Sequence, residues 1–208
     1  DRQQIGNRPN GIYMPRFRNI KDKHPDFVRG YGYQGGAARE DWGRGSNMPG
    51  FGVDFKHQLR QPGPWRFTFG AWGECLPHPD NRMVLDKNKV DAWGVPAMKI
   101  SHKWRENELA IFKDATTTAA EMLQAAGAKD ITQMTTPSLP GECIHEMGSA
   151  RMGRDPKTSV LNQWNQAHDV KNLFITDGSF MASSACQNPS LTYMAMTARA
   201  CDYAVKQM

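Results

Sequence analysis

Two segments in the last third of the sequence carry residue types that can move a proton and hold a ligand. The first segment, residues 143–153, places His145 in a turn interrupted by glycines, with Arg151 close by. An imidazole titrates near neutral pH and can therefore accept the proton of a hydroxyl group. A single histidine in such a turn is more often structural than catalytic, and Arg151 can equally pin its own turn or bind phosphate. The pattern of the neighbouring residues must decide between these roles.

The second segment combines a strand, a tight turn and a helix start. Residues 173–176 are expected to form a strand, and an Asp177-Gly178 turn follows directly. After a loop, Asn188 stands where a helix cap belongs, and Pro189 fits the first turn of the last helix. Turns at the ends of strands commonly hold ligands. This segment therefore predicts a binding site beside the last helix.

Together the two segments resemble the C-terminal signature of the glucose–methanol–choline (GMC) family of flavin-dependent oxidoreductases. That signature is a His-x-x-Gly-Ser/Thr-x-Arg-Met-Gly turn, a strand ending in Asp-Ala/Gly-Ser, and an Asn-Pro-x-x-Thr helix start, in this order. The resemblance is dense over residues 141–205 and weaker over 74–85, and the first 60 residues match none of its motifs. The turn at 147–153 is more similar to bacterial sugar dehydrogenases, such as gluconate or glucoside dehydrogenase flavoprotein subunits, than to cholesterol or choline oxidases.

The resemblance implies a catalytic pair. His145 corresponds to the active-site histidine of the family, which accepts the alcohol proton or orients the hydroxyl group. Asn188 corresponds to the second member of the pair, and its amide can donate to the substrate oxygen without competing for the proton. The implied reaction oxidises a CH–OH group of a sugar or other alcohol by hydride transfer to flavin N5. The alternative from another class is a stand-alone binding module that kept the fold without the flavin chemistry.

The resemblance also implies FAD as the cofactor. Asp177 and Gly178 correspond to the turn that approaches its ribityl and pyrophosphate portion. Asn188, Pro189 and Ser190 begin the helix whose N-terminus faces the pyrimidine edge, where its partial positive charge stabilises the reduced flavin. No Gly-x-Gly-x-x-Gly run that follows a convincing strand and opens a helix, as the site for the ADP portion requires, is found in the sequence, although the spacing itself occurs at Gly30, Gly32 and Gly35. We therefore expect a fragment or one of two chains, in which tight FAD binding needs the missing N-terminal half.

The sequence that precedes the two signature segments indicates which secondary-structure elements hold those segments in place. Residues 1–64 are rich in Gly, Pro and Arg and are expected to form loops and tight turns, among them 31–36 and 43–46. Residues 65–104 alternate polar and apolar side chains and predict antiparallel strands joined by tight turns. The strongest of these stretches are residues 66–70, 83–85 and 97–100.

Residues 105–127 show apolar side chains at three- and four-residue steps, which indicates an amphipathic helix that ends at Gly127. Its apolar stripe needs a partner, most simply one face of the sheet. The pattern as a whole predicts an α+β fold in two parts. A substrate-binding domain with a mainly antiparallel sheet and a packed helix is expected over residues 1–136. An incomplete C-terminal part of an FAD-binding α/β domain is expected over residues 137–208, with the N-terminal Rossmann half absent.

Composition disfavours several other classes of protein. The net charge is +5 and the pI about 9.1, but the basic residues are scattered among acids, which does not favour nucleic acid binding. No apolar run reaches the roughly 18 residues of a transmembrane helix. The sequence gives no support for a serine hydrolase, because the Gly-x-Ser-x-Gly motif of the nucleophile elbow does not occur. The four cysteines are widely spaced, so no metal site is expected, and their even number leaves disulfides open.

The expected partners are a small-molecule alcohol or sugar and, as the candidate protein partner, an electron-transfer subunit or cytochrome. The electron acceptor stays open, as does the location, between the periplasm and the cytoplasm of a bacterium. Four tryptophans can form a sugar-stacking wall, although packing in the core or on the sheet is the commoner role of such residues. They are Trp65, Trp72, Trp93 and Trp104.

Overall fold

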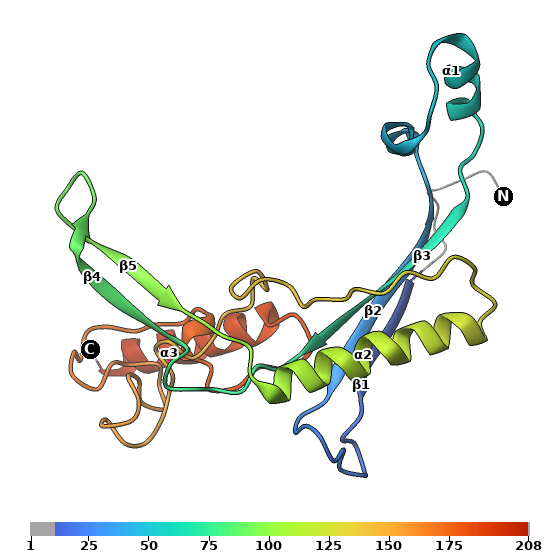
Figure 1. Cartoon of the computed structure of the whole chain (residues 1–208). Helices are drawn as coiled ribbons and strands as arrows, with labels where there is room; N and C mark the ends of the chain where they lie inside the picture. Colours follow the sequence, from blue (N-terminus) through green and yellow to red (C-terminus); the bar gives the residue numbers. More distant parts are fainter. Residues whose placement is uncertain (1–10, 208) are drawn as a thin grey trace.

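The computed structural model describes residues 11–207, so the first ten residues of the expected loop region and Met208 lie outside it. The elements follow the chain in the order β1 (Gly11–Phe17), β2 (Tyr31–Arg39), the 3-10 helix η1 (Trp42–Asn47), α1 (Gly52–Arg60), β3 (Trp65–Gly73), β4 (Arg82–Val90), β5 (Pro96–Ser101), α2 (Glu106–Ala125), the 3-10 helix η2 (Gly178–Phe180) and α3 (Ser190–Gln207). Strands β1, β2 and β3 form one antiparallel sheet in this order, and β4 and β5 form a separate antiparallel pair. The expected α+β fold with antiparallel sheets is confirmed (Figure 1).

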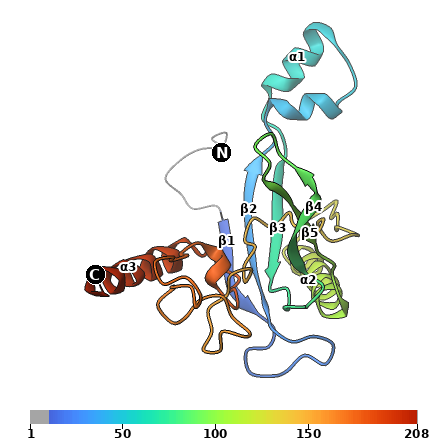
Figure 2. The ribbon, with the colours of Figure 1, turned by 90° about the vertical axis from the view of Figure 1, so that its left-hand side faces the viewer.

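The periodic segments of the sequence form the elements that their patterns predict. Strands β3, β4 and β5 include the three expected stretches, each extended by a few residues. Helix α2 occupies the expected helical segment and ends just before Gly127, whose φ of +82° lies in the left-handed region that favours glycine. Figure 2 shows α2 on one side of the three-stranded sheet and α3 on the other.

The prediction of loops and turns over residues 31–36 is wrong, because this segment belongs to β2, the central strand of the sheet. Its glycines weaken the strand signal in the sequence, but pairing on both edges compensates for their low strand propensity. The glycines also admit close neighbours: a Cβ at Gly32 would lie 3.0 Å from the Cβ of Cys186. Residues 43–46 likewise form part of η1 rather than a simple turn.

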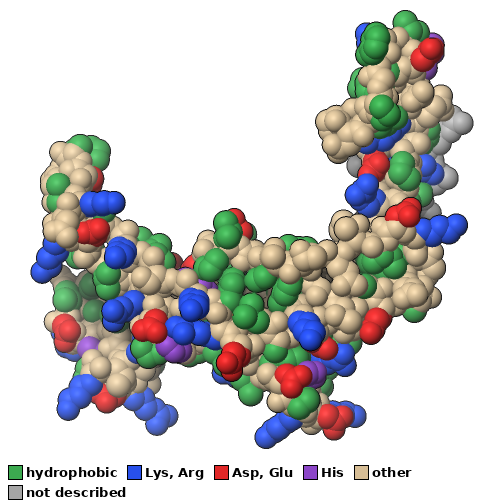
Figure 3. Space-filling model, viewed as in Figure 1, with side chains coloured by type: hydrophobic (Ala, Val, Ile, Leu, Met, Phe, Trp, Pro, Cys, Tyr) green, Lys and Arg blue, Asp and Glu red, His purple; other side chains and the backbone are tan. Residues whose placement is uncertain are grey.

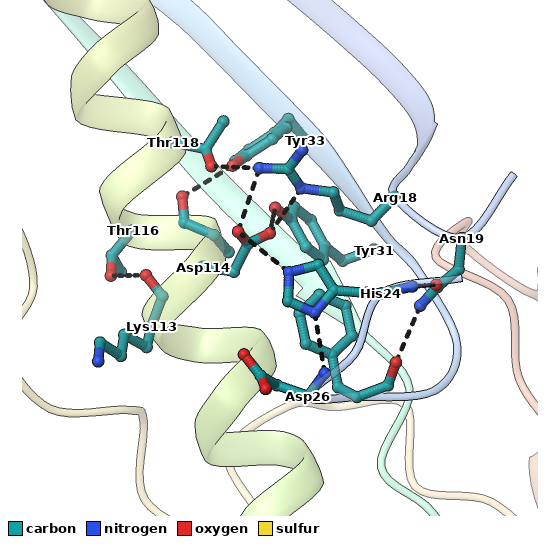
Figure 4. A network of polar contacts seen from close by, with 12 residues as sticks. Arg18, Asn19, His24, Asp26, Tyr31, Tyr33, Lys113, Asp114, Thr116 and Thr118 are labelled. Atoms are coloured by element: carbon teal, nitrogen blue, oxygen red, sulfur yellow. Dashed lines mark hydrogen bonds and ion pairs between the residues drawn. The ribbon is translucent and has the colours of Figure 1, made fainter. Parts of the chain in front are cut away.

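One face of the sheet packs against α2 through an aromatic core. The buried residues of this core are Phe27, Tyr31, Tyr33, Ile111 and Ala115. The hydroxyl of Tyr33 donates to the carbonyl of Ala115 at 2.7 Å, and Asp114 accepts from the hydroxyl of Tyr31 and from the guanidinium of Arg18 at 2.9 Å (Figure 4). Burial by itself raises the pKa of Asp114, but the hydrogen bonds from Arg18 and Tyr31 outweigh it and hold this pKa below its usual value.

Two projections rise from the body of the molecule, with a wide hollow between them in Figure 3. One is the arm formed by η1 and α1, which leads from β2 to β3. Arg44 closes the arm on itself, because its guanidinium donates to five backbone carbonyls, those of Glu40, Asp41, Gln58, Leu59 and Gln61. The other projection is the β4–β5 hairpin. Trp93 at the turn of this hairpin is 86% exposed, so this tryptophan is not packed in the core.

The chain from α2 to α3 contains little regular structure, apart from η2. Residues 173–176, expected as a strong strand, form only an isolated bridge between Phe174 and Gln166. The prediction of a strand is wrong here. A strand needs a neighbouring strand, and among the described residues this segment is bonded only to a short loop. Within residues 11–207, no helix is both long and apolar enough to span a bilayer.

Candidate functional site

The two signature segments of the sequence lie side by side in the structure. The backbone N–H of Ala150 donates to the carbonyl of Ser179 at 3.0 Å, and that of Met152 donates to the carbonyl of Phe180 at 2.9 Å. A second small core lies beneath them. Its buried residues are Leu161, Ala167 and Phe180, with Ala150, Met152, Ile175, Met181, Tyr193 and Met196 packed around them. The loop of His145, the Asp-Gly turn and α3 are therefore held by one cluster.

Gly178 is the point at which these three pieces meet. A Cβ at this position would lie 2.6 Å from the hydroxyl oxygen of Tyr193 on α3 and 3.3 Å from the carbonyl oxygen of Glu146, the residue after His145. Real Cβ contacts below 3.0 Å essentially do not occur, so any larger residue must displace one of these neighbours. Glycine at this position allows the turn, the histidine loop and the helix to approach each other.

Asp177 uses its side chain to hold its own turn. Its Oδ1 accepts from the backbone N–H of Ser179 at 2.8 Å and from the Ser179 hydroxyl, which caps η2. The Ser179 hydroxyl and N–H lower the pKa of Asp177. The carboxylate is thus kept ionised and fixed in place, exposed at the edge of the cluster.

His145 is half-buried in the loop that precedes this cluster. The residue before it, Ile144, has a φ of +57°, a conformation that is unfavourable for a β-branched side chain. The backbone N–H of His145 donates to the sulfur of Cys143 at 3.4 Å, and burial raises the pKa of the Cys143 thiol. The thiol therefore stays protonated at neutral pH and helps to shape the loop rather than acting as a nucleophile.

The expected helix cap at Asn188 is displaced by one residue. Helix α3 begins at Ser190, and the carbonyl of Pro189 accepts the first helical hydrogen bond, from the N–H of Tyr193 at 3.1 Å. Pro189 therefore occupies the N-cap position, and Asn188 precedes the helix. The side chain of Asn188 is exposed and lines an open groove with residues of β1 and β2. The other lining residues are Ile12, Tyr13, Gln34 and Gly35.

The loop before α3 is anchored on the three-stranded sheet. The amide of Gln187 donates to the carbonyl of Pro15 at 2.6 Å. Glu74, directly after β3, accepts from the hydroxyl of Ser183 at 2.6 Å and pairs with Arg29 at 3.1 Å. These contacts set the position of Asn188 relative to the sheet. Gln187 and Arg29 carry no signal in the sequence, because no local pattern reports partners so distant along the chain.

Different parts of the structure hold His145 and Asn188 in place. The first belongs to the loop beside Gly178, the second to the groove on the sheet, and no hydrogen bond joins their side chains within residues 11–207. In the same part of the chain, no cluster of three His, Cys, Asp or Glu side chains has a geometry that could hold a metal ion. All four cysteines are free thiols.

Comparison with known proteins shows the family. Residues 77–197, more than half of the chain, match the sequence profile of GMC oxidoreductase, and the chain therefore belongs to the GMC oxidoreductase family. The 2-methyl-1,2-propanediol dehydrogenase of Mycolicibacterium austroafricanum is 37% identical over 132 residues, which cover 64% of this chain and 24% of that protein. The fructose dehydrogenase large subunit of Gluconobacter japonicus is 36% identical over 131 residues, 62% and 23% of the two chains.

The gluconate 2-dehydrogenase flavoprotein of Pantoea cypripedii is 25% identical over 157 residues, which cover 72% of this chain and 25% of that protein. The chain thus spans about a quarter of the length of these relatives. The resemblance noted in the C-terminal segments is confirmed, including the likeness to sugar dehydrogenase flavoprotein subunits.

Proposed function

We propose that this chain is the substrate-binding and proton-transferring portion of an FAD-dependent oxidoreductase that oxidises a CH–OH group of a sugar or other alcohol. The observation that carries the proposal is the meeting of three segments at Gly178: the loop of His145, the Asp-Gly turn and the first turn of α3. In this proposal residues 1–136 form the substrate-binding domain, and residues 137–208 belong to the FAD-binding domain.

The residues of the site fit a flavin. The first turn of α3 leaves backbone N–H groups without partners inside the helix, and Ser190 and Leu191 in this turn are exposed. The partial positive charge at this end suits the pyrimidine edge of a reduced flavin, with Asn188, Pro189 and Ser190 beside it. Gly178 places no side chain in the crowded turn, and Asp177 precedes it with an exposed carboxylate. When bound, FAD supplies the acceptor for the hydride of the substrate carbon.

His145 takes the hydroxyl proton in this mechanism. Its ring nitrogens have no hydrogen-bond partner among the described residues, so one of them can face a substrate hydroxyl. Removing that proton concentrates electron density on the oxygen and makes the hydride of the neighbouring carbon easier to release. Asn188 donates an N–H to the same oxygen and orients it, since an amide cannot itself accept the proton.

The names of two relatives, a large subunit and a flavoprotein of dehydrogenases, support a protein partner for the full-length protein. We infer that electrons leave the reduced cofactor through a separate electron-transfer subunit or cytochrome. Copurification of the full-length protein with a redox-active chain encoded beside it tests this inference, and efficient direct reduction of oxygen by the isolated protein contradicts it.

The test of the catalytic pair uses the full-length protein loaded with FAD. Positioned proton transfer typically contributes 10²–10⁴-fold in rate, so His145→Ala should slow flavin reduction by about that factor while FAD stays bound. Asn188→Ala should slow it less, because it removes one hydrogen bond rather than the base. Stopped-flow absorbance at saturating alcohol or sugar measures both rates.

His57→Ala, an exposed histidine of α1, is the matched control and should leave the rate unchanged. A folded, FAD-loaded His145→Ala protein that reduces its flavin at the normal rate would falsify the role of this residue. A full-length protein that carries no flavin absorbance and takes up no FAD supports the alternative, a binding module that kept only the fold.

A further inference from the structure

The geometry points to a substrate-selecting subsite on the sheet face opposite α2, in which Gln34, Tyr13 and Trp72 recognise a neutral, polyhydroxylated substrate. The inference rests on the proposed function, because Asn188 forms one wall of the same groove. It adds the residues that choose the substrate to those that carry out the reaction.

The alternation of β2 separates the two faces of the sheet. Tyr31 and Tyr33 are completely buried on the face that packs against α2, and Gly73, paired with Tyr31, lies against Ile111 of that helix. Gln34 must therefore point to the opposite face. On that face it pairs with Tyr13 of β1 on one side and with Gly70 of β3 on the other.

Trp72 lies next to this pair. It belongs to the same face, since it pairs with Gly32, and its ring covers Gly70: a Cβ at Gly70 would lie 2.5 Å from the Cη2 atom of Trp72. Trp72 as a whole is 37% exposed. Of the two roles expected for the tryptophans, Trp72 thus has the geometry of a stacking surface, beside the amide of Gln34.

The loop before α3 closes this face toward the catalytic segments. Gly32 lets Cys186 approach it, and Gln187 is hydrogen-bonded to Pro15 of β1, so Asn188 lines the same open groove as Tyr13 and Gln34. Tyr13 is 52% exposed. The amide of Gln34 makes no hydrogen bond to another described side chain or backbone group, which leaves its donors and acceptor for a ligand.

The chemistry of these groups selects a class of substrate. An amide both donates to and accepts from hydroxyl groups, and aromatic rings cover the apolar C–H face of a sugar. Ile12, Tyr13, Gln34, Gly35, Asn188 and Trp72 carry no charge. The subsite therefore suits a neutral sugar or polyol, whose second and third hydroxyl groups reach Gln34, better than a sugar acid or an alcohol with one hydroxyl group.

The experiment uses the full-length, FAD-loaded protein with D-fructose, D-mannitol, D-gluconate and 1-propanol as probes. Gln34→Leu should raise KM for the neutral probes about 10-fold, as the loss of a substrate hydrogen bond does, with kcat changed less than KM. The KM for 1-propanol should stay within about twofold. Trp72→Ala should act in the same direction. Gln58→Leu, the same change on the exposed surface of α1, is the control.

Binding is measured separately by saturation-transfer NMR, which needs no turnover. Loss of the D-mannitol signal in Gln34→Leu, but not in Gln58→Leu, supports the subsite even if no probe is oxidised. Equal KM changes for mannitol and 1-propanol, or unchanged mannitol binding, overturn it. A wild-type protein that oxidises 1-propanol but neither binds nor oxidises the neutral sugars overturns the subsite alone. One that binds mannitol but reduces its flavin with no alcohol contradicts the proposed function alone.

Discussion

The sheet with α2 and the segment around Gly178 are built in different ways. The first is regular: three paired strands and a 20-residue helix enclose an aromatic core crossed by the Arg18–Asp114–Tyr31 network. The second consists mostly of turns, held by backbone hydrogen bonds between loops and by a small core around Phe180. Of the two residues that we assign to catalysis, His145 lies in the second region, whereas Asn188 lines the groove on the sheet. In the proposed function the regular sheet therefore carries the groove with Asn188, while an irregular loop presents His145.

Tyr33→Ala is the change expected to weaken the regular region most. It empties a completely buried aromatic position and removes the hydrogen bond to the carbonyl of Ala115, so the free energy of unfolding should fall by about 3–5 kcal/mol. Chemical denaturation followed by circular dichroism measures the loss. Tyr13→Ala, a half-exposed tyrosine on the other face of the same sheet, should cost about 1 kcal/mol or less. Equal losses from the two tyrosines would contradict the assignment of faces.

Gly178→Ala should disturb the irregular region without unfolding it. The added Cβ must push away Tyr193 or the loop of His145, and a shift of this size should slow flavin reduction by about 10–100-fold. Stopped-flow reduction of the full-length protein measures the rate. The second change Tyr193→Phe removes the nearest atom and should restore part of the rate. Gly43→Ala on the arm is the control, because its Cβ would meet only the Asp41 side chain.

No recovery in the double variant, together with a normal melting temperature, would show that the spacing at Gly178 does not set the position of the catalytic loop. A loss of folding in Gly178→Ala equal to that in Tyr33→Ala would remove the distinction between the two regions.

Asp114→Asn should have the smallest effect, and its size should depend on pH. Because the pKa of Asp114 is lowered in the folded state, its contribution to stability is present above the unfolded-state pKa of about 4 and is lost as the pH falls through the lowered value. We expect a loss of about 1–2 kcal/mol at pH near 6, and little difference from the wild type at pH near 2. Denaturation curves at the two pH values measure it.

Asp54→Asn, an exposed acid of α1, should change stability little at either pH. If Asp114→Asn destabilises equally at both pH values, the network acts through packing and not through the ionised carboxylate.

Periodic segments were predictable, and segments defined by their neighbours were not. The helix ending at Gly127 and strands β3, β4 and β5 follow from spacing that a single element imposes on its own residues. Strand β2 was missed because its glycines hide the alternation, and the strand at 173–176 was wrong because a strand exists only with a partner. The cap at Asn188 was displaced by one residue, an ordinary error at a helix end.

The sequence by itself determined the family, since the order of the signature residues His145, Asp177 and Asn188 is a property of the chain and needs no coordinates. Only the tertiary structure decided what surrounds them. The approach of three segments at Gly178, and the placement of Tyr13, Gln34 and Trp72 on one face beside Asn188, depend on pairing between residues far apart in the chain. Such pairing cannot be predicted from local sequence, because the register of a strand is set by the strands that lie next to it.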